Sequence, residues 1–186
     1  ATNNTLFGKD SGTAITTGDY NNFFGASAGF STNTGRYNTT IGGEAFYFNT
    51  TGDYNVAVGA DALQTSTTAG NNTAIGRRAG YKITTGSYNT AVGCDSLFEN
   101  TTGQKNVAIG SYSLKDNTTG SELVAIGYEA LNVNTAGNNV AVGAYAGKSN
   151  TTGDSHVYIG YQAGEDATTG LANVAVGLRA LWNCTT

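Results

Sequence analysis

The 186-residue chain is long enough for one ordinary domain, but it has 27 glycines, no proline or methionine, and only 12% charged residues. Its net charge of −4 and its lack of a basic cluster argue against nucleic acid or an anionic membrane as a partner. No apolar run approaches the roughly 18 residues of a membrane-spanning helix, so we expect no membrane insertion.

One repeat accounts for the whole chain. A glycine that closes segments such as "VAVG" recurs eleven times from Gly8 to Gly177. Nine of the ten steps between these glycines are 17 residues long, and the step from Gly127 to Gly143 is 16. We therefore expect residues 1–186 to form a single array of eleven coils, with no separate cap domain.

Each repeat begins with a short apolar strand, from Thr5–Phe7 in the first copy to Val174–Val176 in the last. The residue before the glycine is always Phe, Ile or Val, and the residue two places earlier is Val or Thr in ten copies. A second apolar segment follows the glycine. Its third residue after the glycine is Ala or Ser in every copy, and the fourth is Leu, Gly or Phe. Glycines and β-branched residues exclude a useful helix. The sequence predicts an all-β parallel solenoid with two short strands per coil, stacked about 4.8 Å apart.

Alternation along the strand separates its residues into two faces. We expect Val56 and Val58 to fill the coil and Ala57 to point outward. A row of small apolar residues on an outer face indicates that another surface packs there, so the sequence predicts an oligomer around a shared axis. The alternative is that alanine is tolerated at a crowded outer bend. The row comprises Ala57, Ala74, Ala91, Ala108, Ala125, Ala141 and Ala175.

The position four residues before the glycine is asparagine in nine copies, with Leu123 and His156 as exceptions. In a stacked solenoid these amides can donate to one neighbouring coil and accept from the other, which predicts a structural Asn ladder. The ladder comprises Asn4, Asn21, Asn38, Asn55, Asn72, Asn89, Asn106, Asn139 and Asn173.

The strand and its flanks also resemble known proteins. The segments "NVAVGADAL", "NTAIGRRAG", "NVAIGSYSL" and "LVAIGYEAL" resemble the head repeats of trimeric autotransporter adhesins. The longer pattern "NTTGxxNxAxGxxAL" is similar to arrays in bacteriophage tail-fibre and adhesin-like proteins. This resemblance implies a left-handed parallel β-roll in which three chains wind side by side. It also implies an extracellular place, on a cell surface or a virion. The 17-residue repeat is longer than that of the adhesin heads.

No pattern of catalytic residues is visible. The single histidine, His156, occupies an Asn-ladder position, and its succession after Asp154 and Ser155 is not a catalytic triad, which is built in space. No paired carboxylates, metal-ligand spacing or phosphate loop occurs. We expect no catalytic, cofactor or metal site, and no enzymatic activity.

Aromatic residues recur in two slots that face outward. Both slots are candidates for stacking on sugar rings, and the alternative is that the rings stack on one another and stiffen the solenoid. The first slot, our candidate recognition surface for cell-surface glycans, holds Tyr20, Tyr37, Tyr54 and Tyr88. The second holds Phe30, Tyr47, Tyr81, Phe98 and Trp182. Glycosylation motifs begin, among other places, at Asn38, Asn49, Asn100, Asn117 and Asn150.

The two cysteines lie about five coils apart, on the order of 25 Å, so Cys94 and Cys184 cannot form a bond within one chain. We expect Cys184 to be the better candidate for a disulfide between chains. The last residues, "WNCTT", run in phase into the first, "ATNNTLFG", which predicts head-to-tail stacking of subunits into a filament.

Two functions follow from these observations. The first is a structural, self-assembling extracellular protein of the fibre, filament or adhesin type. The second is a carbohydrate-binding module that recognises surface glycans through its tyrosine slot.

Overall fold

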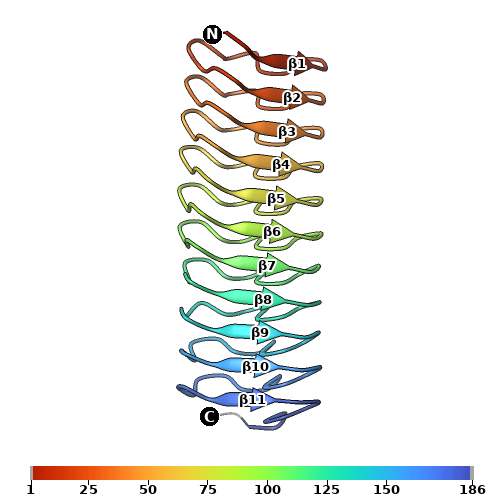
Figure 1. Cartoon of the computed structure of the whole chain (residues 1–186), viewed down its shortest axis with the longest axis vertical. Helices are drawn as coiled ribbons and strands as arrows, with labels where there is room; N and C mark the ends of the chain where they lie inside the picture. Colours follow the sequence, from red (N-terminus) through yellow and green to blue (C-terminus); the bar gives the residue numbers. More distant parts are fainter. Residues whose placement is uncertain (1, 185–186) are drawn as a thin grey trace.

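A computed structural model describes residues 2–184 and shows one sheet of eleven parallel strands in sequence order. The strands are stacked in a straight column, with the two ends of the chain at opposite ends of it (Figure 1). The strands are β1 (Thr5–Phe7), β2 (Asn22–Phe24), β3 (Thr39–Ile41), β4 (Val56–Val58), β5 (Thr73–Ile75), β6 (Thr90–Val92), β7 (Val107–Ile109), β8 (Val124–Ile126), β9 (Val140–Val142), β10 (Val157–Ile159) and β11 (Val174–Val176). The predicted parallel β-solenoid with one coil per repeat is confirmed.

Strand register follows the repeat. Val56 pairs with Thr73, which lies 17 residues further on, and this offset holds along the sheet except at one step. There, Val124 pairs with Val140 at an offset of 16. The missing residue therefore falls outside the strands, and the sheet keeps its alignment because every side chain must stay on its own face.

The prediction of two strands per coil is wrong. After the strand, the chain returns through consecutive turns, in which the second and fourth residues after the repeat glycine adopt positive φ. In the coil of Gly59 these are Asp61 (φ 58°) and Leu63 (φ 50°). Left-handed residues at alternate positions cannot continue a β-ladder. This turn wall still bonds to the next coil, since the Leu63 N–H donates to the Ala79 carbonyl at 3.0 Å.

The repeat glycine is required for two reasons. Gly59 has φ +130°, a conformation that residues with side chains rarely adopt. A Cβ at this position would also lie 2.5 Å from the carbonyl oxygen of Gly76 in the next coil. Glycine thus permits both the sharp exit from the strand and the close stacking of coils.

The expected assignment of the two strand faces is also wrong. Ala57 is fully buried inside the coil, whereas Val56 and Val58 are only partly buried and point outward. The same holds for the alanines of β5 to β9 and β11. The interior holds the strand alanines together with Ala62 and Leu63 from the opposite turn wall, which form part of one continuous core. The space between the walls is narrow, so the smallest side chains of the strand face inward.

Large and small residues exchange places within this core. The commonest combination, found in five of the eleven coils, is an inward alanine on the strand with leucine on the turn wall. In the coil of β2 the strand instead carries Phe23, and a Cβ on Gly29 of the turn wall would lie 2.3 Å from that ring. In β10 the inward residue is Tyr158, and Gly147 and Gly164 leave room for it. Core volume is thus conserved although the residues differ.

Candidate functional site

Each asparagine of the ladder from Asn4 to Asn139 joins its coil to the next by two side-chain hydrogen bonds. The Asn72 carboxamide oxygen accepts the backbone N–H of Asn89 at 2.9 Å, and its nitrogen donates to the Gly86 carbonyl at 2.9 Å. Seven of the nine side chains are buried, the exceptions being Asn4 and Asn173. The ladder therefore satisfies backbone groups where the chain turns into each strand.

The two exceptions to the ladder show what the position requires. Leu123 still donates its N–H to Asn106, at 3.0 Å, but its side chain offers no acceptor to the next coil. His156 keeps the acceptor: its Nδ1 accepts the N–H of Asn173 at 3.0 Å. Burial lowers the pKa of His156 and outweighs the opposing backbone hydrogen bonds. His156 therefore acts as a neutral member of the ladder.

His156 is not arranged for acid–base catalysis. Its ring is buried and lies against Tyr158, with ring centroids 5.0 Å apart. The Ser155 hydroxyl donates to Asp154 at 2.9 Å and not to the imidazole. Among residues 2–184, no group of three or more His, Cys, Asp or Glu side chains is placed to hold a metal ion.

All five glycosylation motifs singled out above start at buried asparagines. Asn38 belongs to the ladder, and the others lie in the turn before it, facing the interior. In that turn the Asn49 oxygen accepts the Gly52 N–H at 2.9 Å, and Asn117 and Asn150 make the same bond at 2.8 Å. The folded chain thus offers none of these five amides to a modifying enzyme. Their positions are Asn38, Asn49, Asn100, Asn117 and Asn150.

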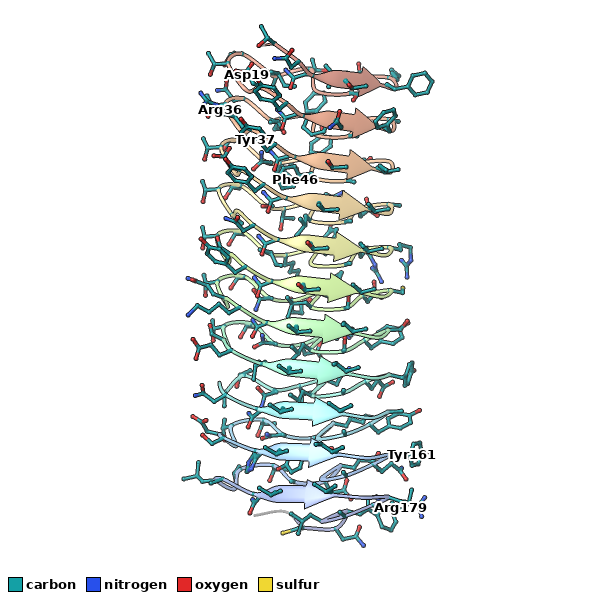
Figure 2. The ribbon with its side chains drawn as sticks, viewed as in Figure 1. Asp19, Arg36, Tyr37, Phe46, Tyr161 and Arg179 are labelled. Carbon is teal, nitrogen blue, oxygen red and sulfur yellow. The ribbon has the colours of Figure 1, made fainter. Side chains whose placement is uncertain are left out.

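The first tyrosine slot forms a column at the edge where the chain enters the strands, as Tyr37 shows in Figure 2. Tyr20 and Tyr37 stack with centroids 5.0 Å apart and planes 2° apart, and Tyr37 and Tyr54 stack at 4.9 Å and 4°. Both faces of Tyr37 are therefore covered, and a sugar ring has no free face there. Tyr88 is exposed and stands two coils further along. Carbohydrate recognition by these four residues stays a prediction, but the geometry favours mutual stacking.

The second aromatic slot forms shorter stacks. Phe30 lies on Tyr47 at 4.9 Å, and Tyr81 lies on Phe98 at 5.0 Å. Trp182 instead receives a cation–π contact from Arg179, with the guanidinium 4.7 Å from the ring centroid. The two stacked pairs join neighbouring coils and contribute to stacking of the solenoid, whereas the Arg179–Trp182 contact lies within one coil.

Charged side chains also pair across one coil. Arg78 makes two hydrogen bonds to the buried carboxylate of Asp95, at 2.8 and 2.7 Å, and this contact raises the pKa of Arg78 despite its partial burial. Lys82 pairs with Glu99 at 2.7 Å in the same manner. Such pairs reinforce the register of the coils.

A further aromatic column escaped the sequence analysis. Tyr112, Tyr128, Tyr145 and Tyr161 lie on four successive coils, with centroids 5.4–5.9 Å apart and interplanar angles of 78–87°. Tyr161 marks the edge beyond the strand ends, opposite the edge of Tyr37 (Figure 2). The column alternates between the second and the first residue after the repeat glycine, so reading one slot at a time could not reveal it. Comparing neighbouring slots would have done so.

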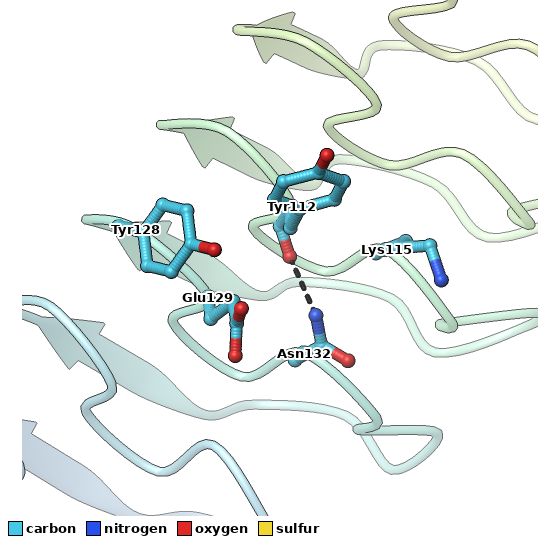
Figure 3. Close-up of a pocket in the computed structure, with 5 residues that line it drawn as sticks. All are labelled: Tyr112, Lys115, Tyr128, Glu129 and Asn132. Carbon is cyan, nitrogen blue, oxygen red and sulfur yellow. Dashed lines mark hydrogen bonds between the residues drawn. The ribbon is translucent and has the colours of Figure 1, made fainter.

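A shallow pocket of about 330 Å³ opens beside this second tyrosine column (Figure 3). Its lining consists of Tyr112, Lys115, Tyr128, Glu129 and Asn132. The Asn132 amide donates to the Tyr112 carbonyl at 3.0 Å, which fixes the floor of the pocket.

Electrostatic contacts hold Glu129 of this pocket in its ionised form. Burial opposes ionisation, but hydrogen bonds from Lys148 and the Tyr128 hydroxyl outweigh it and lower the pKa of Glu129. The Lys148 ammonium lies 2.7 Å from the carboxylate, and this hydrogen bond raises the pKa of Lys148. The hydrogen bond to Glu129 likewise raises the pKa of Tyr128. The pocket thus presents a fixed carboxylate beside aromatic rings.

The outward sheet face, defined as the first and third residues of β1–β11, is uncharged throughout. Of its 22 positions 17 are apolar, four are threonine and one is Asn22. Ile41, Ile75 and Ile159 are each 40–46% exposed on this face. A parallel sheet normally has both of its faces covered, and here one face is open.

The cysteines are half-buried, and no disulfide joins Cys94 to Cys184. The proposed bond between chains through Cys184 stays a prediction.

The in-phase join of the two ends involves residues 1 and 185–186, which lie outside the described residues. No helix that could cross a bilayer occurs between residues 2 and 184.

Comparisons with family models, with curated proteins and with solved structures found no significant match for this chain. The resemblance to adhesin heads and tail-fibre arrays therefore rests on the repeat motifs alone.

Proposed function

We propose that this protein is a structural, non-enzymatic subunit of an extracellular fibre or adhesin-type assembly, and that copies associate through the outward sheet face. The repeat motifs support a place on a cell surface or a virion. The solenoid supplies a rigid rod, and the outward sheet face supplies the contact between rods.

The observation that carries this proposal is the absence of any charged residue from the eleven strands. An isolated rod would normally place polar or charged side chains on an open sheet face. Instead, every strand places at least one valine, isoleucine or phenylalanine on this face over the length of the column, which is about 50 Å at the usual coil spacing. Exposed apolar patches of this size mark interaction sites.

The size of the outward sheet face fits a contact between copies. Three residues per strand span about 10 Å, so the face measures on the order of 500 Å² per chain. Two such faces would bury about 1,000 Å², the lower bound of a specific protein–protein interface. A second copy presents the same regular spacing, which lets side chains of the two sheets interdigitate over the full length.

This proposal replaces the expected role of the alanine row. The alanines point inward and cannot contact a neighbouring chain. The valines and isoleucines of the strands form the outward-facing apolar surface that the alanines were expected to provide. The resemblance to trimeric adhesin heads favours three copies around an axis.

Head-to-tail stacking into a filament is a separate prediction, which electron microscopy of the purified chain tests by showing long filaments or short rods.

Charge placed on the outward sheet face tests the proposal. Sedimentation velocity would compare the wild type with the double variant Ile75→Lys/Ile109→Lys, and with Thr102→Lys, which alters an exposed turn outside the face. We expect the double variant to lose mass relative to the wild type, and Thr102→Lys to keep the wild-type mass. Circular dichroism would verify that each variant keeps its fold. Equal masses for folded wild type and double variant would refute the proposal.

A further inference from the structure

We propose that the pocket beside Tyr112 and Tyr128 is a binding site for a neutral oligosaccharide. This site goes beyond the structural role proposed above. Its residues follow the ends of β7 and β8 in the chain, and none of them belongs to the outward sheet face.

The packing of the tyrosines leaves ring faces available. Tyr112 and Tyr128 meet at 87° with centroids 5.8 Å apart, so the edge of one ring meets the face of the other. Such a contact covers one ring face, whereas each stacked contact in the Tyr20–Tyr54 column covers two. Tyr128 is 41% exposed and Tyr161 is 47% exposed. The apolar face of a pyranose ring packs against aromatic surfaces of this kind.

The polar groups of the pocket retain hydrogen-bonding capacity. Glu129 has about four lone-pair sites, and the contacts described above come from Lys148 and Tyr128. Asn132 donates one amide hydrogen to the Tyr112 carbonyl, and its side-chain oxygen points away from that bond (Figure 3). Lys115, which pairs with Asp116 at 3.3 Å, has further N–H groups. A carboxylate, an amide and an ammonium together can bind several hydroxyls of one sugar.

The charge balance selects the class of ligand. Glu129 and Asp116 offset Lys115 and Lys148 around the pocket. A phosphate or acidic sugar would meet the Glu129 carboxylate, and a cation would meet the two ammonium groups. A neutral ligand with many hydroxyls avoids both costs.

The tyrosine column points to an oligosaccharide rather than a single sugar. Tyr145 and Tyr161 continue the row over two further coils, and the Lys148 ammonium lies 5.1 Å from the Tyr145 ring centroid. An elongated glycan lying along the column would reach aromatic surface on four successive coils. The pocket is at the small end of ligand sites by volume, so contacts along the column supply the remaining binding surface.

A microarray of neutral and acidic oligosaccharides, probed with the wild-type chain, tests this site. Tyr128 has an ordinary backbone conformation, so Tyr128→Ala removes the ring without changing a left-handed residue. Phe48→Ala is the matched control, because Phe48 is exposed, has ordinary φ and lies outside the pocket. We expect Tyr128→Ala to weaken binding of neutral glycans about tenfold, the effect of losing one good aromatic contact.

Further variants locate the site. Glu129→Gln should weaken binding while keeping the ring contacts, and Tyr161→Ala should weaken binding of long glycans more than short ones. Phe48→Ala should bind like the wild type. The double variant Tyr37→Ala/Tyr54→Ala should also bind neutral glycans like the wild type. Loss of binding in this variant would assign recognition to the first tyrosine column and refute our proposal. Wild-type binding to no neutral glycan, preference for acidic glycans, or unchanged binding by folded Tyr128→Ala would likewise refute it.

Discussion

The side-chain oxygen of Asn21 accepts the backbone N–H of Asn38 in the next coil at 3.0 Å, while its nitrogen donates to the Gly35 carbonyl at 2.8 Å. One amide thus satisfies two backbone groups at the entry to the following strand. Because the bonds always run from one coil to the next, each asparagine stabilises an interface between repeats. In repeat proteins such nearest-neighbour interfaces carry much of the stability.

Removing one member of the ladder should destabilise the solenoid strongly. In Asn72→Ala, the Asn89 N–H and the Gly86 carbonyl lose their partners in a buried place. Each of the two orphaned groups costs about 1–3 kcal/mol, so we expect a loss of about 2–6 kcal/mol. Thermal unfolding followed by circular dichroism measures it, and Thr85→Ala, in an exposed turn, is the control. Equal melting temperatures for the two variants would contradict a structural role for the ladder.

His156 should make stability dependent on pH. Burial depresses its pKa in the folded chain below the ordinary 6.5, so the unfolded chain binds the proton more readily. Its stabilising contribution is therefore complete above pH 6.5 and declines as the pH falls toward the folded-state pKa. Protonation of Nδ1 would also remove the acceptor for the Asn173 N–H.

The variant His156→Asn isolates this effect. Asparagine is the usual ladder residue and does not titrate. The unfolding free energy of the variant should therefore fall less than that of the wild type between pH 7 and pH 5. Chemical denaturation at each pH gives the comparison. Parallel pH profiles for the two proteins would show that His156 is not responsible.

The hydroxyl of Tyr158 should contribute nothing to stability. The ring fills the core and is fully buried, but its hydroxyl has no hydrogen-bond partner among residues 2–184. Burial raises the pKa of this phenol to about 12, so it stays protonated at neutral pH. Tyr158→Phe should leave stability unchanged or raise it by about 1 kcal/mol. A clear loss of stability in Tyr158→Phe, measured by urea unfolding, would reveal a partner for the hydroxyl.

Because the Tyr158 ring fills the space that a side chain at position 164 would occupy, substitutions at Tyr158 and Gly164 should have strongly coupled effects on stability. Gly164→Leu alone should destabilise the chain, because its Cβ would already lie 2.5 Å from the Tyr158 ring. The left-handed conformation is not the obstacle, since Leu63 adopts it in the equivalent position. Tyr158→Ala/Gly164→Leu recreates the usual alanine–leucine pair and should recover about 1–3 kcal/mol relative to the sum of the single variants. Additive effects in this double-mutant cycle would contradict the exchange.

Several parts of the structure follow directly from sequence periodicity. The spacing of the repeat glycines predicts the coil, its register and the Asn ladder, because a side chain at a constant phase must meet its copy in the next coil. The 16-residue step is accommodated outside the strands for the same reason, and Val124 still pairs with Val140.

Periodicity could not assign the two faces of the strand. Alternation shows only that Val56 and Val58 share one face and Ala57 has the other. Deciding which faces inward requires the width of the coil, and that width depends on the turn wall, whose left-handed residues do not show in a pattern of apolar positions. The second tyrosine column was missed because Tyr112 and Tyr128 occupy different slots of the repeat and meet only after the backbone turns.

The mass of the wild-type chain in solution, measured by light scattering over a range of concentrations, tests the central claim most directly. One chain has a mass of 19.0 kDa. Association through the outward sheet face predicts a stable multiple of this value, three for the arrangement that the repeat motifs favour. A mass of 19.0 kDa at every concentration, for a folded chain, would contradict the claim.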